Sequence, residues 1–305
     1  ITGGEGTGKS NYVAAIVAGC ICPAGADIDT LGIQITANGR HKAVLLYDTE
    51  QSEVQLFKNV SNLLARAKQP DKPDELKAFC LTGMSRKERL NAIVQSMDKF
   101  YYQYGGIQLV VIDGIADLVK SANDEAESVA VIDELYRLAG IYNTCILCVL
   151  HFVPNGLKLR GHLGSELQRK AATILSIEKD DEPAQSVVKA LKVRDGSPLD
   201  VPLMLFAWDK EAGMHVYKGE KPREEKEKRK ERELVNVARD IFGRQTRITY
   251  IDLCEQLQQV LDIKERTAKS YIRFMRERDI ITKDTANQSC FVIGSYNLQR
   301  NASCP

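Results

Sequence analysis

The first ten residues contain side chains whose types and spacing suit phosphate chemistry. Gly3-Gly4-Glu5-Gly6-Thr7-Gly8-Lys9-Ser10 matches the pattern GxxxxGK[ST] of a phosphate-binding loop. The glycines let backbone N–H groups turn toward an anion, Lys9 brings a positive charge to the β- and γ-phosphates, and Ser10 offers a hydroxyl to Mg²⁺. We therefore expect ATP and Mg²⁺ as cofactors. The residues expected to bind the nucleotide are Gly3, Gly6, Gly8, Lys9, Ser10 and Asn11.

Acidic residues at the ends of two apolar runs predict the metal and water chemistry. Residues 107–113 read as a buried strand that ends in Asp113, a pattern typical of the carboxylate that holds Mg²⁺ opposite Ser10. Residues 42–50 end in Glu50, which we predict to orient or deprotonate the attacking water. The alternative is that Glu50 caps a helix that begins at Gln51.

His151 follows the next apolar run, residues 144–150. A polar side chain at the end of a buried strand can sense the γ-phosphate, so we place His151 with Lys9 and Glu50 among the expected catalytic residues. The alternative is a structural histidine whose ring nitrogens are satisfied by hydrogen bonds.

These residues need elements that bring them together. Strands are expected over residues 42–50, 76–81, 107–113, 144–150 and 171–178, with helices after the phosphate loop and over 54–67, 86–104 and 129–142. This alternation predicts an α/β domain with a mainly parallel sheet, in which ligands lie at the carboxyl ends of the strands. Residues 187–194 and 203–208 predict an antiparallel pair. Because only Ile1 and Thr2 precede the phosphate loop, we expect the first strand of this domain to be missing from the sequence.

The composition changes at the end of this domain, which we expect to span residues 1–217. Residues 218–233 are almost entirely charged with both signs mixed, and they predict a linker or a solvent-exposed helix with i,i+4 ion pairs. Residues 234–305 follow as a second, smaller domain. Three helices over 234–242, 249–261 and 263–278, then strands over 280–282 and 289–294, make it similar to a winged-helix (α+β) domain.

The third of these helices carries the basic residues Arg266, Lys269 and Arg273. We predict that they contact duplex DNA, because a basic helix of this kind can lie in a groove. The alternative is a protein-interaction module whose basic face is solvated.

Composition sets broad limits. The chain has 305 residues, 44% of them hydrophobic, and a formal net charge of +1. Such a chain can bury a large core. It contains no apolar run of about 18 residues and no secretory signal pattern, so we expect a cytoplasmic protein without membrane contact.

Taken in order, the motifs of residues 1–215 resemble those of the RecA-like P-loop ATPases, and especially the hexameric replicative helicases of the plasmid RepA and DnaB type. The matching stretches are Gly3 to Ser10, Tyr47 to Glu50, Leu109 to Asp113, Leu150-His151, Arg160 to Ser165 and Lys192 to Gly196. The resemblance implies a homo-oligomeric ring in which Lys192 and Arg194 reach the γ-phosphate bound by a neighbouring subunit, so both join the expected catalytic residues. The alternative for this pair is a solvated strand edge.

The same resemblance implies that single-stranded DNA passes through the central pore and contacts Lys158 and Arg160. An ordinary surface loop is the alternative for these two residues. The function expected is that of a hexameric ATP-driven helicase or translocase, from a plasmid or other mobile element, that takes part in DNA replication. Two other readings stay open: a RecA/RadA-like ATPase that remodels DNA, and an ATP-dependent DNA-binding regulator without unwinding activity.

Overall fold

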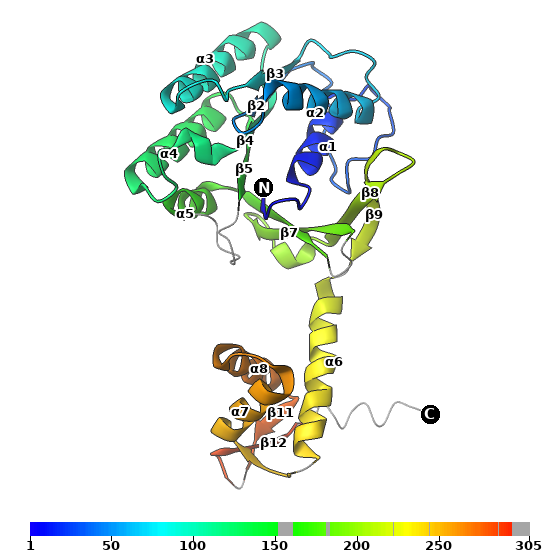
Figure 1. Cartoon of the computed structure of the whole chain (residues 1–305), viewed down its shortest axis with the longest axis vertical. Coiled ribbons are helices and arrows are strands. Elements are labelled where there is room, and N and C mark those ends of the chain that lie inside the picture. The colour runs from blue at the N-terminus through cyan, green and yellow to red at the C-terminus, as the bar shows by residue number, and fades with distance from the viewer. Residues whose placement is uncertain (152–160, 181–183, 222, 244, 286, 295–305) are drawn as a thin grey trace. The chain divides into compact units, whose positions relative to one another are not determined.

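The computed structural model describes residues 1–151, 161–180, 184–221, 223–243, 245–285 and 287–294. The chain divides into two compact units, Ile1–Lys221 and Pro222–Pro305 (Figure 1). Among the described residues, no helix combines the length and the apolar character that a membrane crossing requires.

A nine-stranded sheet organises the first unit. Its order is β3-β2-β4-β5-β1-β6-β7-β8-β9. The strands are β1 (Thr2–Gly3), β2 (Ala43–Asp48), β3 (Leu76–Cys80), β4 (Ile107–Asp113), β5 (Cys145–His151), β6 (Thr173–Lys179), β7 (Gln185–Val193), β8 (Leu203–Asp209) and β9 (Met214–Lys221). The six strands from β3 to β6 pair in parallel, and β7, β8 and β9 add an antiparallel edge. The predicted α/β RecA-like architecture is confirmed.

Helices cover both faces of the parallel strands. They are α1 (Lys9–Ile21), α2 (Glu53–Arg66), α3 (Arg86–Tyr104), α4 (Glu125–Ile141) and α5 (Gly161–Lys170), with short 3₁₀ turns η1 (Ile115–Leu118) and η2 (Pro198–Asp200). In β2, Val44 and Leu46 pack into the apolar cluster under α1 and α2, whereas Leu45 and Tyr47 pack into the one under α3 and α4. Every residue of β2 is therefore buried, which explains its unbroken apolar run.

Two details of the first unit differ from expectation. The central position between β5 and β6 is occupied by β1, a strand of two residues, so a short β1 is present although we expected the first strand to be missing. Helix α5 (Gly161–Lys170) is not among the helices that we expected from the sequence.

The second unit contains α6 (Arg223–Phe242), α7 (Tyr250–Leu261) and α8 (Glu265–Glu277). Its antiparallel sheet has the order β10-β12-β11, formed by β10 (Ile248–Thr249), β11 (Ile281–Lys283) and β12 (Cys290–Ile293). The later half of α6 contributes Leu234, Ala238 and Ile241 to an apolar core shared with α7 and α8.

The boundary differs from the predicted one at residue 217. Strand β9 continues to Lys221 and pairs along that length with β8, so the sheet includes the first four residues of the predicted linker. The remaining charged residues lie in α6, which is the helical alternative for this stretch. Edge strands tolerate charged residues because one side of the strand faces solvent. The charged end of β9 therefore looked like part of the linker in the sequence, and the boundary was predicted too early.

Candidate active site

The phosphate loop joins β1 to α1 at the carboxyl edge of the sheet. Gly8 immediately precedes α1 and has φ +92°, a left-handed conformation that favours glycine. A Cβ atom added there would lie 2.8 Å from the Phe206 ring, so the close packing of β8 against the loop also requires glycine. The loop is thus held with the amino end of α1 facing the place where phosphate is expected.

Lys9 is buried at the base of this loop, with 7% of its surface exposed. Its Nζ donates hydrogen bonds to the carbonyl oxygens of Gly3 at 3.1 Å and Gly4 at 2.5 Å. Burial lowers the pKa of Lys9, while the nearby charges of Asp113 and Glu50 act in the opposite direction. A bound triphosphate would favour the charged amine, so the lysine fits the expected nucleotide.

Two carboxylates lie side by side where β2 and β4 end. The register pairs Asp48 with Asp113. Asp48 is 3% exposed, and its Oδ1 accepts hydrogen bonds from the N–H groups of Glu50 at 3.0 Å and Gln51 at 2.9 Å. Asp48 therefore fixes the turn that follows β2.

Asp113 is in an environment that would favour a cation. Burial, followed by the charges of Asp48 and Glu50, raises its pKa from 3.8 to about 6, although Lys9 and a hydrogen bond from Ser10 oppose the shift. In the described part of the chain, no group of three or more His, Cys, Asp and Glu residues could hold a metal by itself. A Mg²⁺ ion would therefore depend on Ser10, Asp113 and phosphate oxygens, which is how this ion is usually held beside nucleotides.

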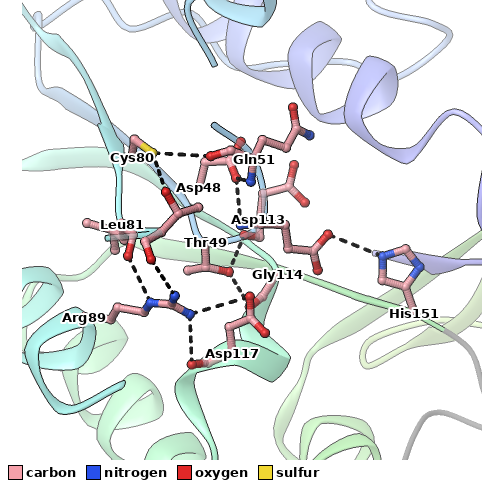
Figure 2. A network of polar contacts seen from close by, with 12 residues as sticks. Asp48, Thr49, Gln51, Cys80, Leu81, Arg89, Asp113, Gly114, Asp117 and His151 are labelled. Carbon is pink, nitrogen blue, oxygen red and sulfur yellow. Dashed lines mark hydrogen bonds and ion pairs between the residues drawn. The ribbon is translucent and has the colours of Figure 1, made fainter. Parts of the chain in front are cut away.

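Glu50 and His151 approach each other at the same edge. A carboxylate oxygen of Glu50 lies 3.6 Å from Nε2 of His151 (Figure 2). The N-cap of α2 is Ser52, whose hydroxyl accepts from the Gln55 N–H, so the alternative that Glu50 caps a helix from Gln51 is wrong. Both side chains of the pair are more than one third exposed, which leaves them open to a substrate.

Lys192 and Arg194 lie away from the phosphate loop of the same chain. On β6, Ile177 pairs with Gly3 and Ile174 pairs with Lys192. The step from Ile174 to Ile177 is three residues along β6. At about 3.3 Å per residue, Lys192 therefore lies about 10 Å from the edge of the sheet where the nucleotide is expected, and Arg194 lies further still. The structure thus does not bring this pair to its own site.

Both side chains instead contact the last turn of α5. The Nζ of Lys192 donates to the carbonyl oxygens of Gln168 at 2.8 Å and Arg169 at 3.3 Å, and Arg194 donates to that of Lys170 at 3.2 Å. Cations are favourable at the carboxyl end of a helix.

The expected DNA contacts fall into two groups. Lys158 and Arg160 lie outside the described residues. Arg266, Lys269 and Arg273 are exposed on α8. Lys269 pairs with Glu265 at 2.6 Å, and Arg273 with Glu277 at 2.8 Å. The opposite face of this helix packs into the core through Ala268, Ile272 and Met275.

Two polar residues at the site were missed in the sequence. Thr49 and Arg89 tie together the loops that follow β2, β3 and β4 (Figure 2). Thr49 directly precedes Glu50, which we did identify, and this is only a weak signal. No sequence signal marks Arg89, because its hydrogen-bond partners lie 7 to 28 residues away in the chain.

The fold and this site define a RecA-like P-loop ATPase. The sequence matches the family model described as an AAA domain over residues 1–155, and the chain belongs to that family. Among solved structures, a KaiC-like protein from the hyperthermophilic archaeon Pyrococcus horikoshii is similar, with 12% identity and a TM-score of 0.48, over 72% of this chain and 87% of that one. A comparison with curated proteins gives no significant match.

Proposed function

We propose that the protein is an ATP-driven DNA motor that works as a hexameric ring, most specifically a replicative-type helicase or translocase of a plasmid or other mobile element. The observation that carries this proposal is the position of Lys192 and Arg194. Lys192 lies near the end of β7 and Arg194 directly follows that strand, about 10 Å or more from the edge of the sheet that holds their own phosphate loop.

This placement favours action on a second subunit. In a head-to-tail ring, one face of each subunit meets a different face of its neighbour, so residues remote from one site can complete the next. A bulge at Leu191 supports this reading, because the register passes from Ala190 to Lys192 at that point and bulges redirect side chains. Arg194 would then stabilise the charge that develops on the transferred phosphoryl group.

The other residues have separable roles within one subunit. ATP, when bound, supplies the γ-phosphoryl group that is transferred to water. The phosphate loop and Lys9 would hold the phosphates, and Ser10 and Asp113 would hold Mg²⁺. Glu50 accepts a proton from the attacking water at its carboxylate, and His151, 3.6 Å away, orients that carboxylate.

The second unit is proposed to bind duplex DNA as a winged helix. Its order of helix, strand, two helices and two strands supports this, as does the basic exposed face of α8. The ion pairs of Lys269 and Arg273 do not oppose it, since exposed i,i+4 pairs are weak and can be exchanged for phosphate contacts.

Two assays on the full chain test the proposal. ATP hydrolysis should rise when single-stranded DNA is added, and a forked duplex should be unwound only with hydrolysable ATP. ATPase activity stimulated by DNA without strand displacement would favour a RecA/RadA-like remodelling enzyme. Slow hydrolysis that ignores DNA, with ATP-dependent binding to duplex, would favour a regulator and contradict the motor.

A further inference from the structure

Thr49 links the two loops that carry the proposed chemistry. It stands between Asp48 and Glu50 and is 2% exposed. Its hydroxyl lies 2.8 Å from the carbonyl oxygen of Gly114 and 3.1 Å from that of Asp113, and its backbone N–H donates to the same Asp113 oxygen at 3.1 Å (Figure 2). The residue before the proposed base is therefore bonded to the residue proposed to hold the metal.

Gly114 closes this contact from the other side. It has φ +92°, and an added Cβ atom would lie 2.3 Å from the Thr49 hydroxyl and 2.6 Å from Cγ of Glu50. The loop after β4 thus packs directly against the stem of the Glu50 side chain. A shift of either loop would move the Glu50 carboxylate relative to Asp113.

Arg89 holds the same loop from the opposite direction. Its guanidinium donates to the carbonyl oxygens of Leu81 at 3.0 Å, Thr82 at 3.2 Å and Asp117 at 3.3 Å, and lies 3.6 Å from the Asp117 carboxylate (Figure 2). Leu81 in turn donates its N–H to the carbonyl oxygen of Asp48 at 2.8 Å. The ends of β2, β3 and β4 are therefore cross-linked, with Thr49 at the bond nearest the proposed base.

We propose that Thr49 is a positioning residue, whose hydroxyl sets the distance between the Glu50 carboxylate and the Asp113 metal position. This inference rests on the proposed role of Glu50 in hydrolysis. The Thr49 hydroxyl is buried and bonded to the carbonyl oxygens of Asp113 and Gly114, so it acts through its neighbours. The effect can still be large, because a misplacement of about 1 Å in a catalytic group can cost about 10²-fold in rate.

A buried hydroxyl also needs partners for purely structural reasons. The two roles differ in what a substitution changes. Loss of a structural bond lowers stability and affects every function equally, whereas loss of positioning lowers kcat, leaves ATP binding intact, and disappears once Glu50 can no longer act as a base.

The test uses the full chain and three substitutions. Thr49→Val keeps the shape but removes the hydroxyl, and it should lower kcat about 10- to 100-fold with ATP-analogue affinity within about 3-fold of wild type. Thr49→Ser restores the hydroxyl and should return kcat to within about 3-fold. Thr144→Val is the matched control, since the buried Thr144 hydroxyl has no hydrogen-bond partner among the described residues, and its kcat should not change.

The decisive step repeats Thr49→Val in a Glu50→Gln background. There the substitution should change the residual rate less than about 3-fold, because the group it positions has been disabled. An equal fold-loss in both backgrounds, or a Thr49→Val enzyme with wild-type kcat, would overturn the inference. If Thr49→Val does not fold, Thr49→Ala replaces it with the same expectations. A wild-type chain without ATPase activity would instead contradict the proposed function.

Discussion

Nε2 of His151 and a carboxylate oxygen of Glu50 lie 3.6 Å apart, although Glu50 follows β2 and His151 ends β5. Strand β4 lies between those two strands, so the pair spans the end of the strand that carries Asp113. The contact therefore places the proposed base beside the histidine proposed to orient it, at the end of the strand that carries the expected metal ligand.

Replacing His151 should separate its catalytic from its structural contribution. Because the pair is more than one third exposed, it should contribute less than about 1 kcal/mol to the free energy of unfolding. His151→Ala should thus leave the Tm nearly unchanged but lower kcat about 10-fold. His151→Gln, which keeps an N–H donor, should lose less. A large fall in Tm with unchanged kcat would show that His151 is the structural histidine of the alternative reading.

Asp113 should make the nucleotide-free protein less stable at neutral pH. Its pKa is about 6 in the folded chain and close to 3.8 when unfolded, so the unfolded state releases the proton first. The free energy of unfolding therefore begins to fall as the pH rises past about 4, and the loss is complete above about 6. Two pKa units correspond to roughly 3 kcal/mol.

Asp113→Asn removes that cost. In Mg²⁺-free buffer the variant should unfold at higher temperature than wild type at pH 7.5, and the difference should shrink toward pH 4.5. Differential scanning calorimetry at both pH values measures this. A gain in Tm that does not depend on pH would mean that packing, rather than ionisation of Asp113, is responsible.

The exposed face of α8 should carry the duplex contacts. Replacing Arg266, Lys269 and Arg273 with Ala should weaken duplex binding and reduce the slope of log K against log salt by about 2 to 3, since each lost phosphate contact removes about 0.9 of a released counterion. Fluorescence anisotropy over a salt series measures both quantities.

Replacing the acidic residues on the same helix is the matched control, because it should change duplex affinity in the opposite direction. Glu265→Gln with Glu277→Gln releases Lys269 and Arg273 from their ion pairs and should tighten duplex binding. If neither set of substitutions changes the affinity or the slope, α8 is not the DNA face and the protein-interaction reading is favoured.

The sequence predicted those parts of the fold whose signals are local. The helix over 86–104 is present as Arg86–Tyr104, with a capping box between Ser85 and Glu88 and a left-handed Gly105 after its end. The strand over 107–113 is buried on both faces and so appears as one apolar run.

The parts that it did not predict depend on contacts distant in the sequence. Thr49 bonds to residues 64 and 65 positions away, and Arg89 to one 28 positions away. No spacing rule finds such partners, because they meet only when β2, β3 and β4 are assembled. The candidate roles of Lys192 and Arg194 came from the resemblance, and their distance from their own phosphate loop came from the register of β6 and β7.

Action of Arg194 on a neighbouring subunit is the central claim, and mixing two inactive variants tests it most directly. Glu50→Gln removes the base and Arg194→Ala removes the arginine, so each homogeneous assembly should bind ATP but lose hydrolysis, by about 10²-fold and 10³-fold. In a mixed ring, the Glu50→Gln subunit still supplies Arg194 and the Arg194→Ala subunit still supplies Glu50. An interface that joins these two residues therefore has both catalytic groups. Mixed assemblies should therefore regain ATPase activity that peaks at intermediate ratios. Mixed rings, verified by mass measurement, that stay inactive at every ratio would contradict the claim.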